Sequence, residues 1–157
     1  MDRLDAFYMD TAVAAANLSR AVRLKVGAVA VFDRNIIGFS FNGTPAGDDN
    51  NCEDKVYMSS EDSPMEDYPF CDLQGRYRLV TKLTVLHAEE NVITKIASSN
   101  NSCKNATLFV THSPCIRCAR MIHSAGFTRL IYANPYWDQT PIDFLKSKNI
   151  SCELYNE

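Results

Sequence analysis

Two short segments contain the side chains best suited to chemistry. The first reads Leu86-His87-Ala88-Glu89-Glu90-Asn91. The second reads Ser113-Pro114-Cys115-Ile116-Arg117-Cys118. Each segment is expected to open a helix, where unpaired backbone N–H groups and the helix dipole favour a thiolate over a thiol. Because Cys115 and Cys118 are three positions apart, they lie on one side of the first helical turn and can hold one ion.

A histidine and two cysteines suit a catalytic zinc site. Zinc accepts two thiolates and one imidazole in a tetrahedral arrangement and leaves the fourth position to water, whereas a structural site needs a fourth protein ligand. The sequence therefore predicts one Zn²⁺ ion held by His87, Cys115 and Cys118.

Glu89 stands two residues after His87, so it is not a natural fourth ligand on the same helix face. It is placed to take a proton from a water molecule and to pass protons to a ring nitrogen and a leaving amine. His-x-Glu followed by Pro-Cys-x-x-Cys is the signature of zinc deaminases. A structural zinc knuckle or a chance cluster of thiols would leave the glutamate and the proline unexplained. We therefore expect Glu89 to be catalytic.

Length and composition are those of one soluble domain: 157 residues, 46% hydrophobic and 22% charged. Apolar runs stay short of the roughly 18–20 residues that cross a bilayer, and the N-terminus does not resemble a signal peptide. We therefore expect a cytoplasmic protein without a membrane partner. In that setting six cysteines favour metal or redox chemistry over a disulfide framework.

The charges are unevenly distributed. Residues 45–72 hold nine of the 19 acidic side chains and one of the 16 basic ones, while residues 101–130 hold four basic side chains and no acid. Long polynucleotides need Lys and Arg along their phosphates, so this pattern disfavours a nucleic-acid polymer as a partner. A mononucleotide needs only one small cationic pocket.

The elements that must position these residues follow from hydrophobic spacing. We predict a first helix over residues 2–22 and a hairpin of strands over 26–32 and 36–41. Residues 48–72 are polar and aperiodic, which favours a functional surface loop. Further on, helices are expected at 86–96, 115–124 and 141–146, and strands at 106–111, 130–132 and 151–155. The order predicts one α/β domain over 1–157, a mixed sheet with helices on both faces, and an acidic surface insertion at about 45–75.

Three further segments accompany the zinc motifs: Lys25-Val26-Gly27-Ala28-Val29, Phe41-Asn42-Gly43-Thr44-Pro45-Ala46-Gly47 and Cys52-Glu53-Asp54. With them, nearly the whole chain resembles the deoxycytidylate (dCMP) deaminase family of the cytidine deaminase-like superfamily. The resemblance implies a three-layer α/β/α fold around a mixed five-stranded sheet. It also implies hydrolysis of dCMP to dUMP and ammonia for thymidylate synthesis.

The same resemblance assigns the substrate contacts. Asn42 would bind the sugar hydroxyl, and Val26 and Ala88 would flank the base. Ser113 would offer its backbone to the departing amine, and Tyr136 would close the pocket. For the phosphate, Lys25 is preferred, while three other basic residues stay open as alternatives: Arg20, Arg23 and Arg117.

Members of this family are commonly hexamers that dCTP activates and dTTP inhibits. An effector triphosphate, with Mg²⁺, would bind the loop that contains Asn42, Gly43, Thr44, Gly47 and Asp49. A second zinc ion is not expected. Cys52 and Cys71 bracket the insertion, but no histidine falls between Cys71 and His87.

Several alternatives remain open at this point. The substrate could be dCTP, tRNA adenosine or free cytidine, or the chain could be a zinc protein that binds dCTP without turnover. Outside the motifs, we interpret His112 as polar filling at a strand end rather than as part of the site. Trp137 could equally belong to the core or to the pocket, and Cys103 and Cys152 are expected to be simple thiols.

Overall fold

A five-stranded sheet lies at the centre of the computed structural model, which describes residues 3–59 and 64–156. Its strands run in the order β2-β1-β6-β7-β8, with bounds β1 Gly27–Phe32, β2 Asn35–Phe41, β6 Thr107–His112, β7 Arg129–Asn134 and β8 Ser151–Leu154. β1 pairs antiparallel with β2 and with β6, whereas β6, β7 and β8 are parallel. The predicted mixed five-stranded sheet is confirmed.

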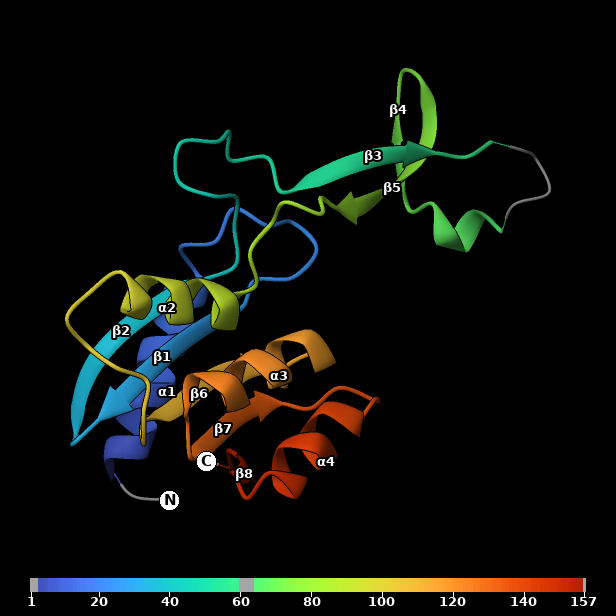
Figure 1. The fold of residues 1–157 in the computed structure, drawn as a ribbon. Coiled ribbons are helices and arrows are strands. Elements are labelled where there is room, and N and C mark those ends of the chain that lie inside the picture. The colour runs from blue at the N-terminus through green and yellow to red at the C-terminus, as the bar shows by residue number, and fades with distance from the viewer. Residues whose placement is uncertain (1–2, 60–63, 157) are drawn as a thin grey trace.

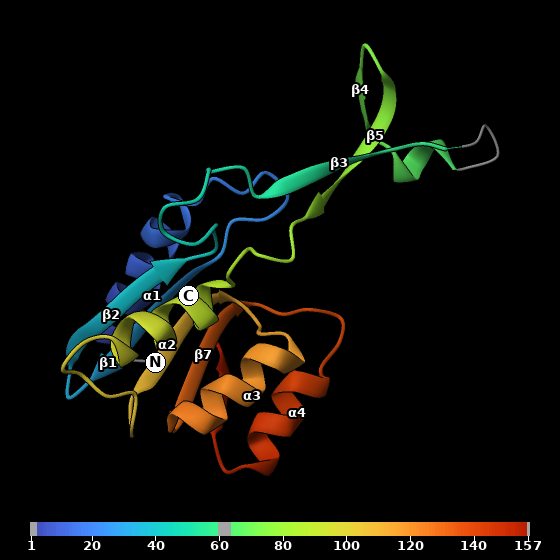
Figure 2. The same ribbon diagram turned by 45° about the horizontal axis from the view of Figure 1, so that its top comes forward.

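Helices cover both faces of this sheet (Figure 1, Figure 2). α1 (Arg3–Ala16) packs on one face, and the other face carries α2 (Ala88–Ala97), α3 (Ile116–Ala125) and α4 (Thr140–Ser147). The architecture is therefore the predicted three-layer α/β/α fold. Among the described residues, no helix is both long enough and apolar enough to cross a membrane.

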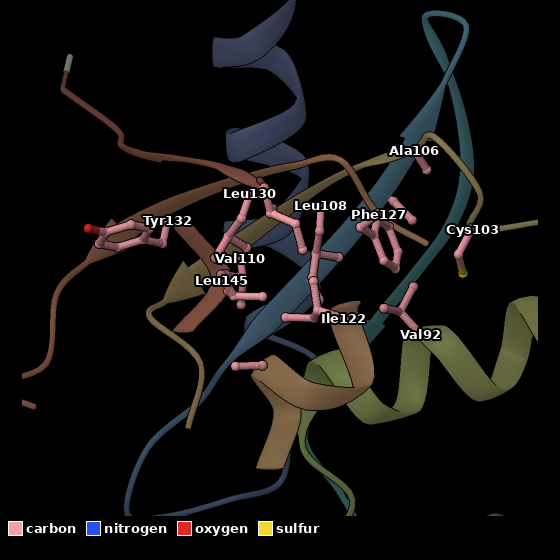
Figure 3. Close-up of a cluster of buried hydrophobic side chains, with 14 of the residues drawn as sticks. Val92, Cys103, Ala106, Leu108, Val110, Ile122, Phe127, Leu130, Tyr132 and Leu145 are labelled. Carbon is pink, nitrogen blue, oxygen red and sulfur yellow. The ribbon is translucent and has the colours of Figure 1, made fainter. Parts of the chain in front are cut away.

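Alternating strand residues build the two cores. In β1, Val29 and Val31 face α1, while Ala28 and Ala30 belong to the cluster under the other three helices. Figure 3 shows that second cluster, in which Leu108 and Val110 of β6 lie among side chains of α2, α3 and β7. Strands that are buried on both faces need continuous apolar runs, as these strands have.

Helix α1 ends at Ala16 and not at residue 22, so the C-terminal part of that prediction is wrong. Leu18 and Val22, which continue the apolar pattern, are 56% and 67% exposed. The Ser19 hydroxyl instead donates to the carbonyl of Asn42 at 2.7 Å. Its partner lies 23 positions away in the chain, so helical periodicity gives no sign of this contact.

The acidic insertion is also more regular than predicted. Together with the residues that follow it, up to Thr81, it forms a second antiparallel sheet in the order β3-β5-β4, with a 3-10 turn η1 over Met65–Asp67. The strand bounds are β3 Glu53–Tyr57, β4 Phe70–Asp72 and β5 Gly75–Thr81. We call these three strands the arm, since they extend away from the central sheet (Figure 1, Figure 2).

Cross-strand pairs explain why an aperiodic sequence forms the arm. Tyr77 lies opposite both Tyr57 and Phe70, with ring centroids 5.6 and 5.5 Å apart. The Lys55 ammonium lies 2.6 Å from the Asp72 carboxylate. These partners are distant in sequence, so a search for local periodicity finds a loop where the chain builds strands.

Candidate active site

The three predicted metal ligands come together at the N-termini of two neighbouring helices. His87 is the N-cap of α2 and Cys115 is the N-cap of α3, while Cys118 lies in the first turn of α3. His87 Nδ1 lies 3.7 Å from Cys115 Sγ and 3.4 Å from Cys118 Sγ. The three ligand atoms lie within 4.8 Å of one another.

These distances fit a tetrahedral zinc ion. With Zn–S bonds of about 2.3 Å and Zn–N bonds of about 2.0 Å, tetrahedral angles require N···S separations of about 3.5 Å. The observed 3.4 and 3.7 Å lie on either side of that value. One nitrogen and two sulfurs are also the ligand set of a catalytic zinc site with one open position.

The cysteines differ in their tendency to ionise. A hydrogen bond from the Cys118 thiol, together with the contact to His87, lowers the pKa of Cys115 to about 3. The hydrogen bond that the Cys118 thiol donates to Cys115, together with burial, raises the pKa of Cys118. Cys115 is therefore the thiolate that would meet an incoming cation first, and Cys118 would lose its proton on metal binding.

Glu89 follows in the first turn of α2 and is only 4% exposed. Burial raises the pKa of its carboxyl to about 7, since a charge is costly in such surroundings. A carboxyl poised near neutrality can both accept and donate a proton. Glu90 has a different role, because its carboxylate accepts the backbone N–H of His87 at 3.3 Å and so holds the start of the helix.

The cluster opens into a cavity of about 400 Å³, within the size range of small-molecule sites. Its lining comes mainly from four places: the N-termini of α2 and α3, the ends of the central strands, the loop before β1 and the base of the arm. The lining residues are Ala21, Arg23, Leu24, Val26, Asn42, Glu53, Thr81, Val85, His87, Ala88, Glu89, His112, Ser113, Cys115 and Tyr136.

Two polar side chains set the shape of this cavity. Asn42 accepts the N–H of Val26 at 2.9 Å and donates to the carbonyl of Leu24 at 2.8 Å, so its amide fixes the backbone that enters β1. The Ser113 hydroxyl accepts the N–H of Tyr136 at 2.9 Å. That bond ties the segment after β7 to the metal-binding loop and places Tyr136 at the cavity.

The base of the arm holds the loop before β1. Glu53, only 5% exposed, accepts the backbone N–H groups of Val22 and Arg23 at 2.9 and 3.2 Å. Thr81, which lies opposite Glu53 in the arm, accepts a hydrogen bond from the Arg23 guanidinium at 3.3 Å. The arm therefore places a cationic side chain at the cavity.

The sequence of the chain matches a known protein family over most of its length. Residues 2–134 match the model of the cytidine and deoxycytidylate deaminase zinc-binding region. The chain belongs to this family.

Individual deaminases of the family agree with that assignment. The chain is 33% identical to the deoxycytidylate deaminase of Mycobacterium phage D29 over 82% of its own length and 92% of the relative. It is 29% identical to the enzyme of Enterobacteria phage T4, over 88% of this chain and 81% of that one. The dCMP deaminase of cyanophage S-TIM5, solved in complex with dCMP and dUMP, shares 33% identity and 99% coverage of both chains, with a TM-score of 0.79.

The fold brings most of the predicted deaminase site together. The zinc ligands and Glu89 meet as expected, and five of the predicted substrate contacts line the same cavity: Val26, Asn42, Ala88, Ser113 and Tyr136. Lys25, the preferred phosphate contact, is exposed and does not line the cavity, nor do the alternatives Arg20 and Arg117. Trp137 belongs to neither core nor cavity, being 94% exposed.

Several lining residues were missed or undervalued. His112 lines the cavity rather than only filling a strand end. Glu53 comes from the segment that we interpreted as a loop, and Thr81 comes from residues 73–85, for which no element was predicted. Of the basic candidates, Arg23 alone lines the cavity that the described residues form. The Cys52-Glu53-Asp54 segment carried the only sequence signal for this part of the site, since it belongs to the family resemblance.

The predicted effector loop lies next to the metal cluster. Gly43 and Leu86, the residue before His87, exchange two backbone hydrogen bonds of 3.1 and 2.9 Å. The Thr44 hydroxyl donates to the carbonyl of Asp49 at 2.6 Å. Gly47 adopts a φ of +97°, which favours glycine at that turn.

Proposed function

We propose that this family member is a zinc-dependent dCMP deaminase that hydrolyses dCMP to dUMP and ammonia. The observation that carries the proposal is the buried Glu89 carboxyl beside a cluster of three candidate zinc ligands, His87, Cys115 and Cys118, in a cavity that Arg23 also lines. The named activity of the phage relatives and the dCMP and dUMP bound to the cyanophage structure support the choice of substrate.

When bound, zinc supplies Lewis-acid activation of a water molecule near neutral pH. His87, Cys115 and Cys118 would hold the ion. The Glu89 carboxylate takes one proton from the attacking water and delivers it to N3 of cytosine while the water oxygen bonds to C4. It then passes the remaining hydroxyl proton to the exocyclic amine, so that the C4–N bond breaks and ammonia leaves. Its first-turn position keeps the carboxyl close to the cluster, and its burial keeps bulk water from competing for the proton.

Substrate contacts follow the cavity. Val26 and Ala88 would flank the base, and the Ser113 backbone would receive the amine. Asn42 would reach the sugar, although its amide already holds the backbone of residues 24 and 26. Arg23, rather than Lys25, is our preferred contact for the 5′-phosphate, because Arg23 lines the cavity and Thr81 orients its guanidinium.

A substrate panel tests this proposal. Zinc-loaded protein is incubated with dCMP, dCTP, cytidine and a tRNA hairpin, and loss of the cytosine absorbance and release of ammonia are measured. We expect turnover of dCMP above the other three. No turnover of dCMP, with or without dCTP as activator, would refute the function.

The catalytic assignment needs a variant that keeps the metal site. Glu89→Gln preserves the shape of the side chain but cannot carry the proton, so we expect dCMP turnover to fall at least about a thousandfold. Bound zinc, measured by elemental analysis, should match that of the unaltered protein. Normal turnover in this variant would show that another group moves the proton.

Regulation and assembly are a separate part of the proposal. A Mg²⁺ complex of dCTP or dTTP would bind the loop at Asn42, Gly43, Thr44, Gly47 and Asp49, and the Gly43–Leu86 bonds would pass a change there to His87. We propose a cytoplasmic homohexamer of single-domain subunits. Light scattering measures the assembly, and dCMP turnover with added dCTP or dTTP tests the effectors.

A further inference from the structure

His112 is the last residue of β6 and stands three positions before Cys115. Its ring lines the active-site cavity and lies beside Tyr136, with ring centroids 6.2 Å apart. The deaminase chemistry described above does not use it. A half-buried imidazole on a substrate cavity raises the question of which hydrogen bond it offers.

Thr111, which is almost fully buried, determines which hydrogen bond the His112 ring can offer. The Thr111 hydroxyl accepts the backbone N–H of Gly27 at 3.1 Å and lies 3.1 Å from His112 Nδ1. Within the described part of the chain, it has no third hydrogen-bond partner. A buried hydroxyl proton left without an acceptor is costly, so the hydroxyl must donate its proton to Nδ1.

That bond fixes the tautomer of the ring. If Nδ1 accepts a proton from Thr111, a neutral His112 carries its own proton on Nε2. Burial lowers the pKa of His112, which favours this neutral form. Nε2 has no hydrogen-bond partner among residues 3–59 and 64–156, and the atom is accessible to solvent. An N–H donor is therefore available at the cavity.

We propose that His112 donates a hydrogen bond from Nε2 to an oxygen of the bound nucleotide, and that Thr111 positions the ring in the tautomer that can do so. The inference rests on the proposed function, because it takes the cavity to be the nucleotide site. A neutral donor of this kind orients the nucleotide and takes no part in the proton transfers assigned to Glu89.

The first test reads the tautomer directly and does not depend on activity. The chain has three histidines, so the His112 ring nitrogens can be assigned in a nitrogen-15 NMR spectrum of zinc-loaded protein by comparison with His112→Gln. We expect Nδ1 to be unprotonated and Nε2 to be protonated near pH 7.5. The opposite tautomer would overturn the proposal.

The second test measures binding of the product dUMP by calorimetry in a matched pair of variants. His112→Gln keeps a donor near the position of Nε2, whereas His112→Asn keeps an acceptor near Nδ1 but no donor at the cavity. We expect about a three- to tenfold weaker affinity for dUMP in the Asn variant and near-normal affinity in the Gln variant. Equal affinities in all three proteins would overturn the proposal.

Deoxyuridine, which lacks the phosphate, locates the accepting oxygen. A loss of affinity in His112→Asn for dUMP alone places it on the phosphate, and a loss for both ligands places it on the sugar or base. Thr111→Val should shift the His112 ring toward a mixture of tautomers, whereas Thr111→Ser should not. Failure of unaltered protein to turn over dCMP would refute the proposed function, while the tautomer and dUMP measurements would still decide this inference.

Discussion

At the scale of single residues, the active site depends on helix N-termini. His87 and Cys115 are both N-caps, and Glu89 and Cys118 follow within the first turns. Backbone N–H groups at these positions stabilise the thiolate that a metal needs. Burial acts in the opposite sense on Glu89 and keeps its proton exchangeable near pH 7. Two helix starts thus bring the proposed metal ligands and the proposed proton carrier to the same place.

Mutation can distinguish the two candidate phosphate contacts, Arg23 and Lys25. We expect Arg23→Gln to raise KM for dCMP about tenfold or more, because it removes a charge-assisted hydrogen bond to the phosphate. Turnover of deoxycytidine, which has no phosphate, should change little. Steady-state kinetics with both substrates measures the difference. If Lys25→Gln rather than Arg23→Gln raises KM for dCMP, the assignment made from the cavity is wrong.

At the scale of elements, the contact between α1 and β1 requires glycine. A Cβ atom on Gly27 would lie 1.9 Å from the carbonyl oxygen of Ala12 and 2.6 Å from the nitrogen of Ala16. Helix α1 therefore packs directly on the strand that enters the active site. Two side chains also hold the start of this strand: Asn42 accepts the N–H of Val26, and Thr111 accepts the N–H of Gly27.

Gly27→Ala should therefore destabilise the protein by about 3 kcal/mol, since helix and strand must separate to admit the methyl group. Urea denaturation followed by circular dichroism measures the free energy of unfolding. Gly43→Ala is the matched control, because its Cβ would meet its nearest neighbour at an ordinary 4.0 Å. Equal stabilities of the two variants would contradict the close approach of α1.

Glu53 connects the arm to the cavity. Glu53→Leu leaves the N–H groups of Val22 and Arg23 without their acceptor, so the loop that carries Arg23 should lose its fixed position. We expect KM for dCMP to rise about tenfold. In Glu53→Gln the amide oxygen still accepts both bonds, and KM should return most of the way to normal. A Gln variant as impaired as the Leu variant would show that the negative charge itself is needed.

At the scale of the whole molecule, one ion cluster joins the first and last elements of the chain. The Arg129 guanidinium of β7 binds the Asp5 carboxylate of α1 at 3.1 and 3.2 Å and the Glu153 carboxylate of β8 at 2.7 and 2.9 Å. The Asp5 side chain is only 9% exposed, whereas the Glu153 side chain is 38% exposed. The cluster therefore has one buried and one solvent-accessible pair.

These pairs should differ in their effect on stability. Arg129→Met takes the guanidinium from the buried Asp5 and should cost about 3 kcal/mol of unfolding free energy. Glu153→Gln removes only the accessible pair and should cost less than about 1 kcal/mol. Urea denaturation of the two variants at pH 7 measures both. A Glu153 variant as unstable as the Arg129 variant would contradict this ranking.

The Glu153 pair also has a predictable pH dependence. Hydrogen bonds from Arg129 lower the pKa of Glu153 below its ordinary value of 4.5. Its stabilising effect is therefore complete above pH 4.5 and is lost as the pH falls through the folded-state pKa. The difference in stability between unaltered protein and Glu153→Gln should shrink when urea denaturation is repeated below pH 4.5. A difference that grows on acidification would contradict the sign of this pKa shift.

Sequence alone determined the reaction chemistry and the architecture. The residue types and short spacings within two predicted helix starts, His87 to Glu89 and Cys115 to Cys118, indicated the zinc ligands and the proton carrier. The apolar runs of β1, β6 and β7 indicated strands. Each of these patterns lies within a short stretch of the chain, whereas the meeting of His87 with the two cysteines 28 and 31 positions later depends on the packing of α2 beside α3.

Only the tertiary structure showed which residues line the cavity. The end of α1 at Ala16, the strands of the arm, and the choice of Arg23 over Lys25 all depend on hydrogen bonds between residues far apart in sequence. The tautomer proposed for His112 also involves a long-range contact, since the Thr111 hydroxyl accepts the N–H of Gly27 and has its own proton left to donate to Nδ1. Local sequence patterns do not encode such long-range partners. The residues proposed for the chemistry could therefore be predicted from the sequence, whereas the residues that line the rest of the cavity could be identified only from the fold.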